Sequence, residues 1–277
     1  MGDGDQQGAA LRGDLEISEE SAQLLGQAIA SLLREPWEGV TASLAAPDVL
    51  LDLCAQYITN TRRVHDTWGI DELVSEYLCQ MSGESWKTVR HVAARPRRGS
   101  PLAMRLYLSL FRAAARQRRG VGLGQMRASL LVIGAYLRGL AGLGSQSIYP
   151  LTMPLSRRER RRLQVDPEDP WGGRVTRLML ARHVESGGLL HAPNLVLGWR
   201  LALLAVAIAR RGASALARAR GEDQVTRSCL EQALEMVRDD LLSEGRVWKM
   251  LSSTSLIRDI TERFLSRRSV VATLLGD

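Results

Sequence analysis

The chain has 277 residues, of which 45% are hydrophobic and 24% charged, so it can bury a substantial core and is not a disordered tail. Its formal net charge is +7, and Lys87 and Lys249 are the only lysines among 37 basic residues. The three cysteines show no disulfide or metal-ligand spacing, which is typical of a reducing compartment. The first residues are acidic and polar, so we expect neither a secretory signal nor a transit peptide there.

Helical periodicity and helix caps recur along the chain, and no segment alternates like a strand, so we predict an all-α fold. In the first third, Ser18 precedes a helix that ends before Pro36, and Pro47-Asp48 is expected to open the next helix. An apolar stripe from Ile70 to Met81 predicts a third helix, and a short fourth runs from Ser85 to Arg95.

Helical periodicity of the apolar residues also continues through the rest of the chain. The apolar stretch 195–209 is too short to cross a bilayer, because a spanning helix needs about 20 residues, and we interpret it as a buried helix. Expected helices cover residues 101–119, 125–140, 157–163, 170–185, 193–211 and 222–243, with a last one after 252–255.

Charge is segregated along the sequence. Residues 1–85 hold 15 acidic and 4 basic residues, residues 86–220 hold 5 acidic and 25 basic ones, and residues 221–277 hold 10 and 8. We predict two helical bundles: an N-terminal domain over 1–141, acidic to 85 and basic from 86, and a C-terminal domain over 157–277. The loop 142–156, which lacks periodicity of its own, is the expected linker.

Arginines are the candidate binding residues. Five of them fall within residues 157–162, so they ring a helix and cannot all be buried. Four more share one face of the helix 101–119. Guanidinium groups bind phosphate, and both membranes and RNA present phosphates. The predicted membrane- or nucleic-acid-binding residues are Arg157, Arg158, Arg160, Arg161, Arg162, Arg105, Arg112, Arg116 and Arg119.

Catalytic and cofactor signals are weak. The four histidines are scattered, the paired carboxylates look like solvated helix faces, and no nucleotide, metal or redox motif is present. The glycine-rich segment 120–124 lacks the strand and the Lys-Ser/Thr of a phosphate loop, so we interpret it as a helix–helix turn. We therefore expect no catalytic residues, no metal and no cofactor, and a protein that is not an enzyme.

Residues 147–163 resemble the segment that joins the two helical domains of influenza-type (orthomyxovirus) matrix proteins. Leu151, Thr152, Pro154 and the triplet 160–162 carry this match. Further along the chain, Leu190-His191 falls where the family opens a long apolar helix, Cys229, Glu231 and Gln232 resemble its Cys-Glu-Gln helix, and Leu256-Ile257-Arg258 resembles a later segment.

The chain also departs from the family. The family's linker lies much nearer its N-terminus, and its second basic stretch is matched only loosely, by Arg174, Arg177 and Arg182. Cys229 lacks the partners of the family's zinc-like pattern, so zinc is not carried over.

The resemblance implies a structural protein of the virion, located beneath the envelope and in the host cytoplasm. It would bind anionic membrane and viral ribonucleoprotein or RNA, and assemble with itself into a shell. The arginine cluster is also typical of a nuclear import signal. Two alternatives remain: a nucleoprotein-like RNA binder, and a helical protein whose arginines only reflect a G+C-rich coding sequence.

Overall fold

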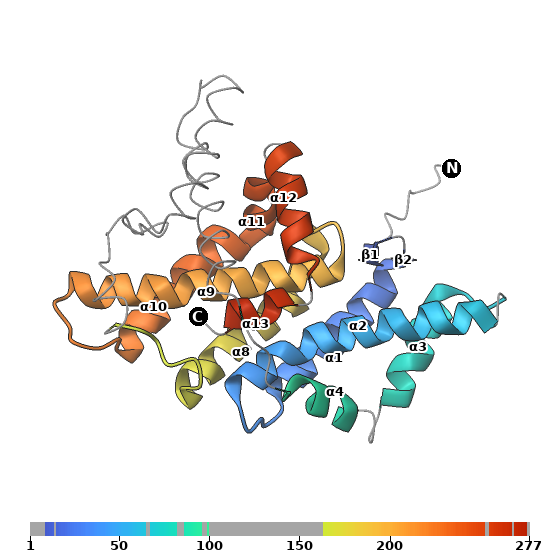
Figure 1. The fold of residues 1–277 in the computed structure, drawn as a ribbon, viewed down its shortest axis with the longest axis horizontal. Helices are drawn as coiled ribbons and strands as arrows, with labels where there is room; N and C mark the ends of the chain where they lie inside the picture. Colours follow the sequence, from blue (N-terminus) through green and yellow to red (C-terminus); the bar gives the residue numbers. More distant parts are fainter. Residues whose placement is uncertain are drawn as a thin grey trace. The chain divides into compact units, whose positions relative to one another are not determined.

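The structure, a computed structural model, describes residues 9–13, 15–64, 67–81, 86–95, 99, 163–252, 255–267 and 269–275 (Figure 1). The chain divides into two compact units, each drawn from two stretches of sequence: Met1–Pro96 with Gly173–Ala202, and Arg97–Gly172 with Leu203–Asp277. The predicted linker 142–156 lies outside the described residues, so the predicted domain bounds stay a prediction.

The all-α prediction is confirmed for the described residues, with one small addition. Strands β1 (Ala9–Arg12) and β2 (Leu15–Ile17) form an antiparallel hairpin that the sequence analysis missed. Gly13 has a φ of +55°, which glycine adopts at little cost in such a turn. The strands are too short for alternation to be visible in the sequence, because only Leu11 and Ile17 are buried.

Four helices follow in the first unit. Ser18 caps α1, its side chain accepting a hydrogen bond from the Ser21 amide, and Leu25, Ile29 and Leu33 form the buried face of that helix. Helices α2 and α3 pack against α1, and α4 packs on α2. The bounds are α1 (Glu19–Arg34), α2 (Val40–Val64), α3 (Ile70–Gln80) and α4 (Trp86–Ala93).

The expected helix start at Pro47 is wrong. Helix α2 begins at Val40 and passes through Pro47, which cannot donate to the Ser43 carbonyl. Residues 43–51 are all buried, so tertiary packing holds a helix that local propensity would interrupt.

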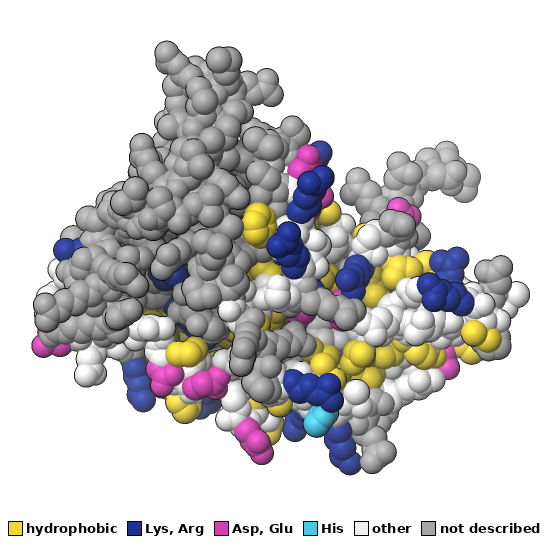
Figure 2. All heavy atoms as spheres, in the orientation of Figure 1, with side chains coloured by type: hydrophobic (Ala, Val, Ile, Leu, Met, Phe, Trp, Pro, Cys, Tyr) yellow, Lys and Arg dark blue, Asp and Glu magenta, His cyan; other side chains and the backbone are white. Residues whose placement is uncertain are grey.

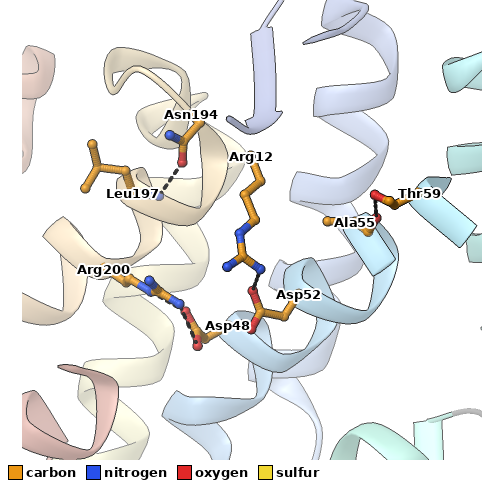
Figure 3. Close-up of polar contacts among 8 residues, drawn as sticks. All are labelled: Arg12, Asp48, Asp52, Ala55, Thr59, Asn194, Leu197 and Arg200. Atoms are coloured by element: carbon orange, nitrogen blue, oxygen red, sulfur yellow. Dashed lines mark hydrogen bonds and ion pairs between the residues drawn. The ribbon is translucent and has the colours of Figure 1, made fainter. Parts of the chain in front are cut away.

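The second half of the chain carries α8 (Pro170–Glu185), the short 3-10 turn Gly188–His191 and α9 (Leu195–Ala219). Residues 195–209 are all buried, which confirms the predicted buried helix, and α9 continues beyond the expected end at 211. Asn194 caps α9 by accepting a hydrogen bond from the Leu197 amide at 2.8 Å (Figure 3). None of the described helices is long and apolar enough to span a bilayer.

Helix α10 starts five residues later than expected. Gly221, at a φ of +70°, ends α9, and Thr226 caps α10 through the Cys229 amide. A π-helical turn, Arg238–Leu242, follows it. The remaining helices of the second unit are α10 (Arg227–Val237), α11 (Arg246–Leu251), α12 (Ser255–Leu265) and α13 (Ser269–Leu275).

A buried ion pair joins α2 to the first half of α9 within the first unit. Arg200 Nε lies 2.7 Å from Asp48 Oδ1 and Arg200 Nη2 lies 3.3 Å from Asp48 Oδ2, with both side chains at most 2% exposed (Figure 3). Removing one partner of such a pair costs about 3–5 kcal/mol, because the other charge stays buried. Nearby, Arg12 of β1 donates to Asp52 of α2 at 2.6 Å, which ties the hairpin to the same helix (Figure 3).

Candidate anion-binding surface

All nine arginines predicted as binding residues lie outside the described residues, so their placement stays a prediction. The structure therefore offers its own candidates among the remaining cations. We define two candidate surfaces in the first unit. The α4 face consists of Lys87, Arg90, His91 and Arg95. The α8 stripe consists of Arg174, Arg177, Leu178 and Arg182.

Lys87, Arg90, His91 and Arg95 share one side of α4 and its C-terminal turn, and Figure 2 shows Lys or Arg side chains beside a histidine over this helix. Several of these groups already have partners. Arg90 forms an ion pair with Glu35 and stacks over the Trp37 ring, with 5.3 Å from its guanidinium carbon to the ring centroid. Arg95 lies 3.3 Å from the Nε2 of His91. The α4 face is therefore partly neutralised within the first unit.

The α8 stripe is less neutralised. Between Pro170 and Val184 the sequence of α8 contains no acidic residue. Asp169 Oδ2 accepts the Gly172 amide at 2.8 Å, so this carboxylate, which directly precedes the helix, serves as its cap. Positive charge therefore accumulates between Arg174 and Arg182, and the only acidic residue of α8 is Glu185 at its end.

Arg174 and Arg177 are the centre of the α8 stripe. Arg174 is exposed, whereas Arg177 is half-buried and donates to the Ser43 hydroxyl of α2 at 3.3 Å. Burial lowers the pKa of Arg177, and the positive charge of Arg174 lowers it further. Among the described residues, neither guanidinium has a carboxylate partner. Two neighbouring cations without a carboxylate partner in the described part of the chain form a candidate site for an anion.

Tight packing fixes the position of Arg177. A Cβ built on Gly173 would lie 2.2 Å from a methyl carbon of Val40, so only glycine lets α8 approach the start of α2 this closely. The close approach places Arg177 over the first turn of α2, where Ser43 Oγ in turn donates to the Val40 carbonyl.

The exposed part of the stripe combines charge with an apolar side chain. Leu178 is 42% exposed and lies one helical turn from both Arg174 and Arg182. The side chain of Arg182 is exposed near Glu185, whose pKa is lowered chiefly by its hydrogen bond from Arg34. The stripe therefore presents Arg174, Leu178 and Arg182 outward, with Arg177 beside them.

In the sequence, Arg174, Arg177 and Arg182 match the second basic stretch of the matrix-protein family only loosely. The signal in the sequence that distinguishes them is the absence of acidic residues from 170 to 184. Only the structure shows that Arg174 and Arg177 have no carboxylate partner among the described residues.

Cys229 is buried in the first turn of α10, with its Sγ 3.3 Å from Glu222 Oε2. In the part of the chain that is described, no three His, Cys, Asp or Glu side chains lie close enough to hold a metal ion.

Comparisons with protein families, curated proteins and solved structures found no match to this chain.

Proposed function

We propose that the chain is a non-enzymatic structural protein that binds anionic membrane through arginine side chains and assembles with copies of itself. It acts in the manner of a viral matrix protein, beneath an envelope and in contact with ribonucleoprotein. The observation that supports the proposal most is the Arg174–Arg177 pair, two adjacent guanidinium groups without a carboxylate partner among the described residues. One guanidinium group can bind two phosphate oxygens at once, and lipid headgroups present a dense layer of phosphates.

Lipid phosphate suits the α8 stripe better than RNA does. Recognition of single-stranded nucleic acid relies on aromatic side chains that stack on the bases. The four residues of the stripe include none, and the one tryptophan of α8, Trp171, is already stacked under the guanidinium of Arg227, 5.0 Å from the ring centroid. Leu178 instead offers an apolar side chain between two arginines, which can enter the headgroup layer while the guanidinium groups stay at the phosphates.

The test measures binding of the full chain to phosphatidylserine vesicles at low ionic strength. Each arginine near an anionic surface contributes about 1 kcal/mol, so the double variant Arg174→Gln/Arg177→Gln is expected to bind about 30-fold more weakly. The matched control is Arg238→Gln/Arg258→Gln, which also removes two positive charges, because these exposed arginines are paired with Asp239 and Asp259 at 2.8 Å and 3.7 Å. Unchanged vesicle affinity in the double variant would remove the α8 stripe from the proposal.

The same assay tests the arginine cluster predicted from the sequence. Replacing Arg160, Arg161 and Arg162 by alanine should lower vesicle affinity about a hundredfold at low salt, since three charges are lost. RNA binding measured beside it, over several salt concentrations, separates the alternatives. Variants that lose RNA binding while keeping vesicle binding would favour the nucleoprotein-like function.

A further inference from the structure

The last turns of α2 and residues 67–72 at the start of α3 extend beyond the core of the first unit. Ile58 is the last buried residue of α2, and Leu73 is the first buried residue of α3. The described residues between them, 59–64 and 67–72, include no buried one. Six residues of α2 therefore extend past its last core contact, a length of about 9 Å.

Large apolar side chains gather on this projection. Val64 is 75% exposed and Trp68 is 42% exposed, and these are two of the four large hydrophobic side chains that are exposed in the described part of the chain. They lie within five positions of each other. A single exposed apolar residue is ordinary, but a valine and a tryptophan together at the end of a helical hairpin mark a contact site.

Two arginines directly precede Val64. Arg62 and Arg63 occupy the last turn of α2, both are exposed, and neither has an ion-pair partner among the described residues. Figure 2 shows Lys or Arg and hydrophobic side chains beside one another at this end of α2 and α3. We call Arg62, Arg63, Val64 and Trp68 the α2–α3 tip.

Two carboxylates among the described residues near the tip stabilise the helix ends. Asp71 Oδ1 accepts the backbone amide of Ser18 at 2.9 Å and its hydroxyl at 3.0 Å, which holds the start of α1 against α3. Glu72 Oε2 accepts the Gly69 amide at 3.2 Å and so closes the first turn of α3. Below the tip, the rings of Tyr57 and Tyr77 pack 5.5 Å apart and join the two helices. The α2–α3 tip therefore extends from two helices that pack against each other.

We infer that the α2–α3 tip is an apolar anchor that enters the interfacial layer of a phospholipid bilayer. Val64 and Trp68 reach the boundary of the acyl chains, and Arg62 and Arg63 stay at the lipid phosphates. Tryptophan favours this layer because its ring is apolar while its indole N–H can donate to polar groups, and arginine extends along the apolar region to the phosphates. Interfacial segments enter about 5–10 Å, a depth that the projection can reach.

The positive charges decide between a membrane and another protein as the occupant. A protein groove that accepted Val64 and Trp68 would also have to supply carboxylates for Arg62 and Arg63, whereas a bilayer surface presents phosphates around any inserted side chain. The choice of a membrane as partner rests on the proposed function, but the tip and the α8 stripe are separate surfaces, and different measurements report on them.

The test compares the full chain with Val64→Ser and Trp68→Ala in vesicle co-sedimentation, at low salt and at about 0.5 M salt. Electrostatic contacts are screened at high salt, while apolar insertion is not. Each tip variant is expected to lose about tenfold in vesicle affinity at both salt concentrations. The α8 variant Arg174→Gln/Arg177→Gln loses affinity at low salt only. The control Leu24→Ser removes a leucine that is 37% exposed on α1 and should bind like the parent.

A second measurement reports insertion directly. Lipids brominated along the acyl chains quench a tryptophan that reaches them, so vesicles of brominated lipid should quench the parent chain more than the variant Trp68→Phe. Equal quenching in both chains, or tip variants that bind vesicles as the parent does, would overturn the inference and leave the proposed function standing. Tip variants that change the oligomeric mass without lipid would assign the tip to a protein contact instead.

Discussion

His183 is a half-buried histidine that the fold keeps neutral. Its ring lies against the backbone of Gly188, where an added Cβ would be 2.1 Å from the ring carbon Cε1. Burial, together with the nearby His191, lowers the pKa of His183 to about 4. The ring therefore favours the neutral form well below the pH at which a free histidine would become charged.

This pKa predicts a loss of stability in acid. In the unfolded chain His183 titrates near its ordinary value of about 6.5, so between pH 6.5 and 4 the unfolded state binds more protons than the folded state. The stabilisation is complete above pH 6.5 and is lost as the pH falls toward 4, with a total of up to about 3 kcal/mol. Urea unfolding of the parent and of His183→Gln at several pH values measures this contribution.

The difference between the two chains should shrink by that amount as the pH falls from 6.5 to 4. Leu178→Ala, at an exposed position of the same helix without a titratable group, is the control and should leave the pH dependence as in the parent. Parallel curves for the parent and His183→Gln would show that His183 titrates alike in the folded and unfolded states.

Most helices of the described chain follow from local signals in the sequence. Three local signals each predicted a helix that the structure contains, because caps and apolar spacing act within one or two turns. These signals are Ser18, the Ile70–Met81 stripe and Asp169-Pro170. The helix start predicted at Pro47 was wrong for the opposite reason. Burial of residues 43–51 of α2 outweighs the local preference of proline, and that burial depends on segments far away in the sequence.

Helix α9 allows a direct test of the predicted core. Leu203 is fully buried, as is its neighbour Val206, so Leu203→Ala leaves a cavity and should reduce the free energy of unfolding by about 2–5 kcal/mol. Thermal or urea denaturation measures the effect. Leu178→Ala, at an exposed position of α8, is the control and should change stability little. A melting temperature within a degree of the parent for Leu203→Ala would contradict the burial of this face.

At the scale of the whole molecule, the sequence showed where charge accumulates but not which charges are paired. Arg200 stood out as a lone charge inside an apolar run, yet its partner Asp48 lies 152 positions earlier and only the fold brings them together. Arg174 and Arg177 lie in a stretch without acidic residues, and only the structure shows that neither has a carboxylate partner among the described residues. Local patterns fix elements, whereas the pairing of charges depends on tertiary contacts.

The segregated charge predicts self-association. Residues 1–85 hold 15 acidic and 4 basic residues, and residues 86–220 hold 5 and 25, so an acidic surface of one copy can contact a basic surface of the next. Where the rotation between copies does not close a ring, such head-to-tail contacts generate open filaments or sheets, the geometry that a shell requires. Deleting residues 1–60 would not test this cleanly, because Leu25, Ile29 and Leu50 belong to the core of the first unit.

Substitution of exposed carboxylates is the sharper experiment. Glu19 and Glu20 lie exposed in the first turn of α1, and changing both to Gln removes two negative charges while leaving the core intact. The control Glu231→Gln/Glu235→Gln makes the same change in charge on exposed positions of α10. Light scattering of the parent should show a mass that rises with concentration at low ionic strength and falls as salt screens charges over about 8–10 Å. Glu19→Gln/Glu20→Gln should shift toward monomer, and the α10 control should not. A monomer at every salt concentration, or equal masses for both double variants, would remove this assembly mechanism and favour the RNA-binding alternative.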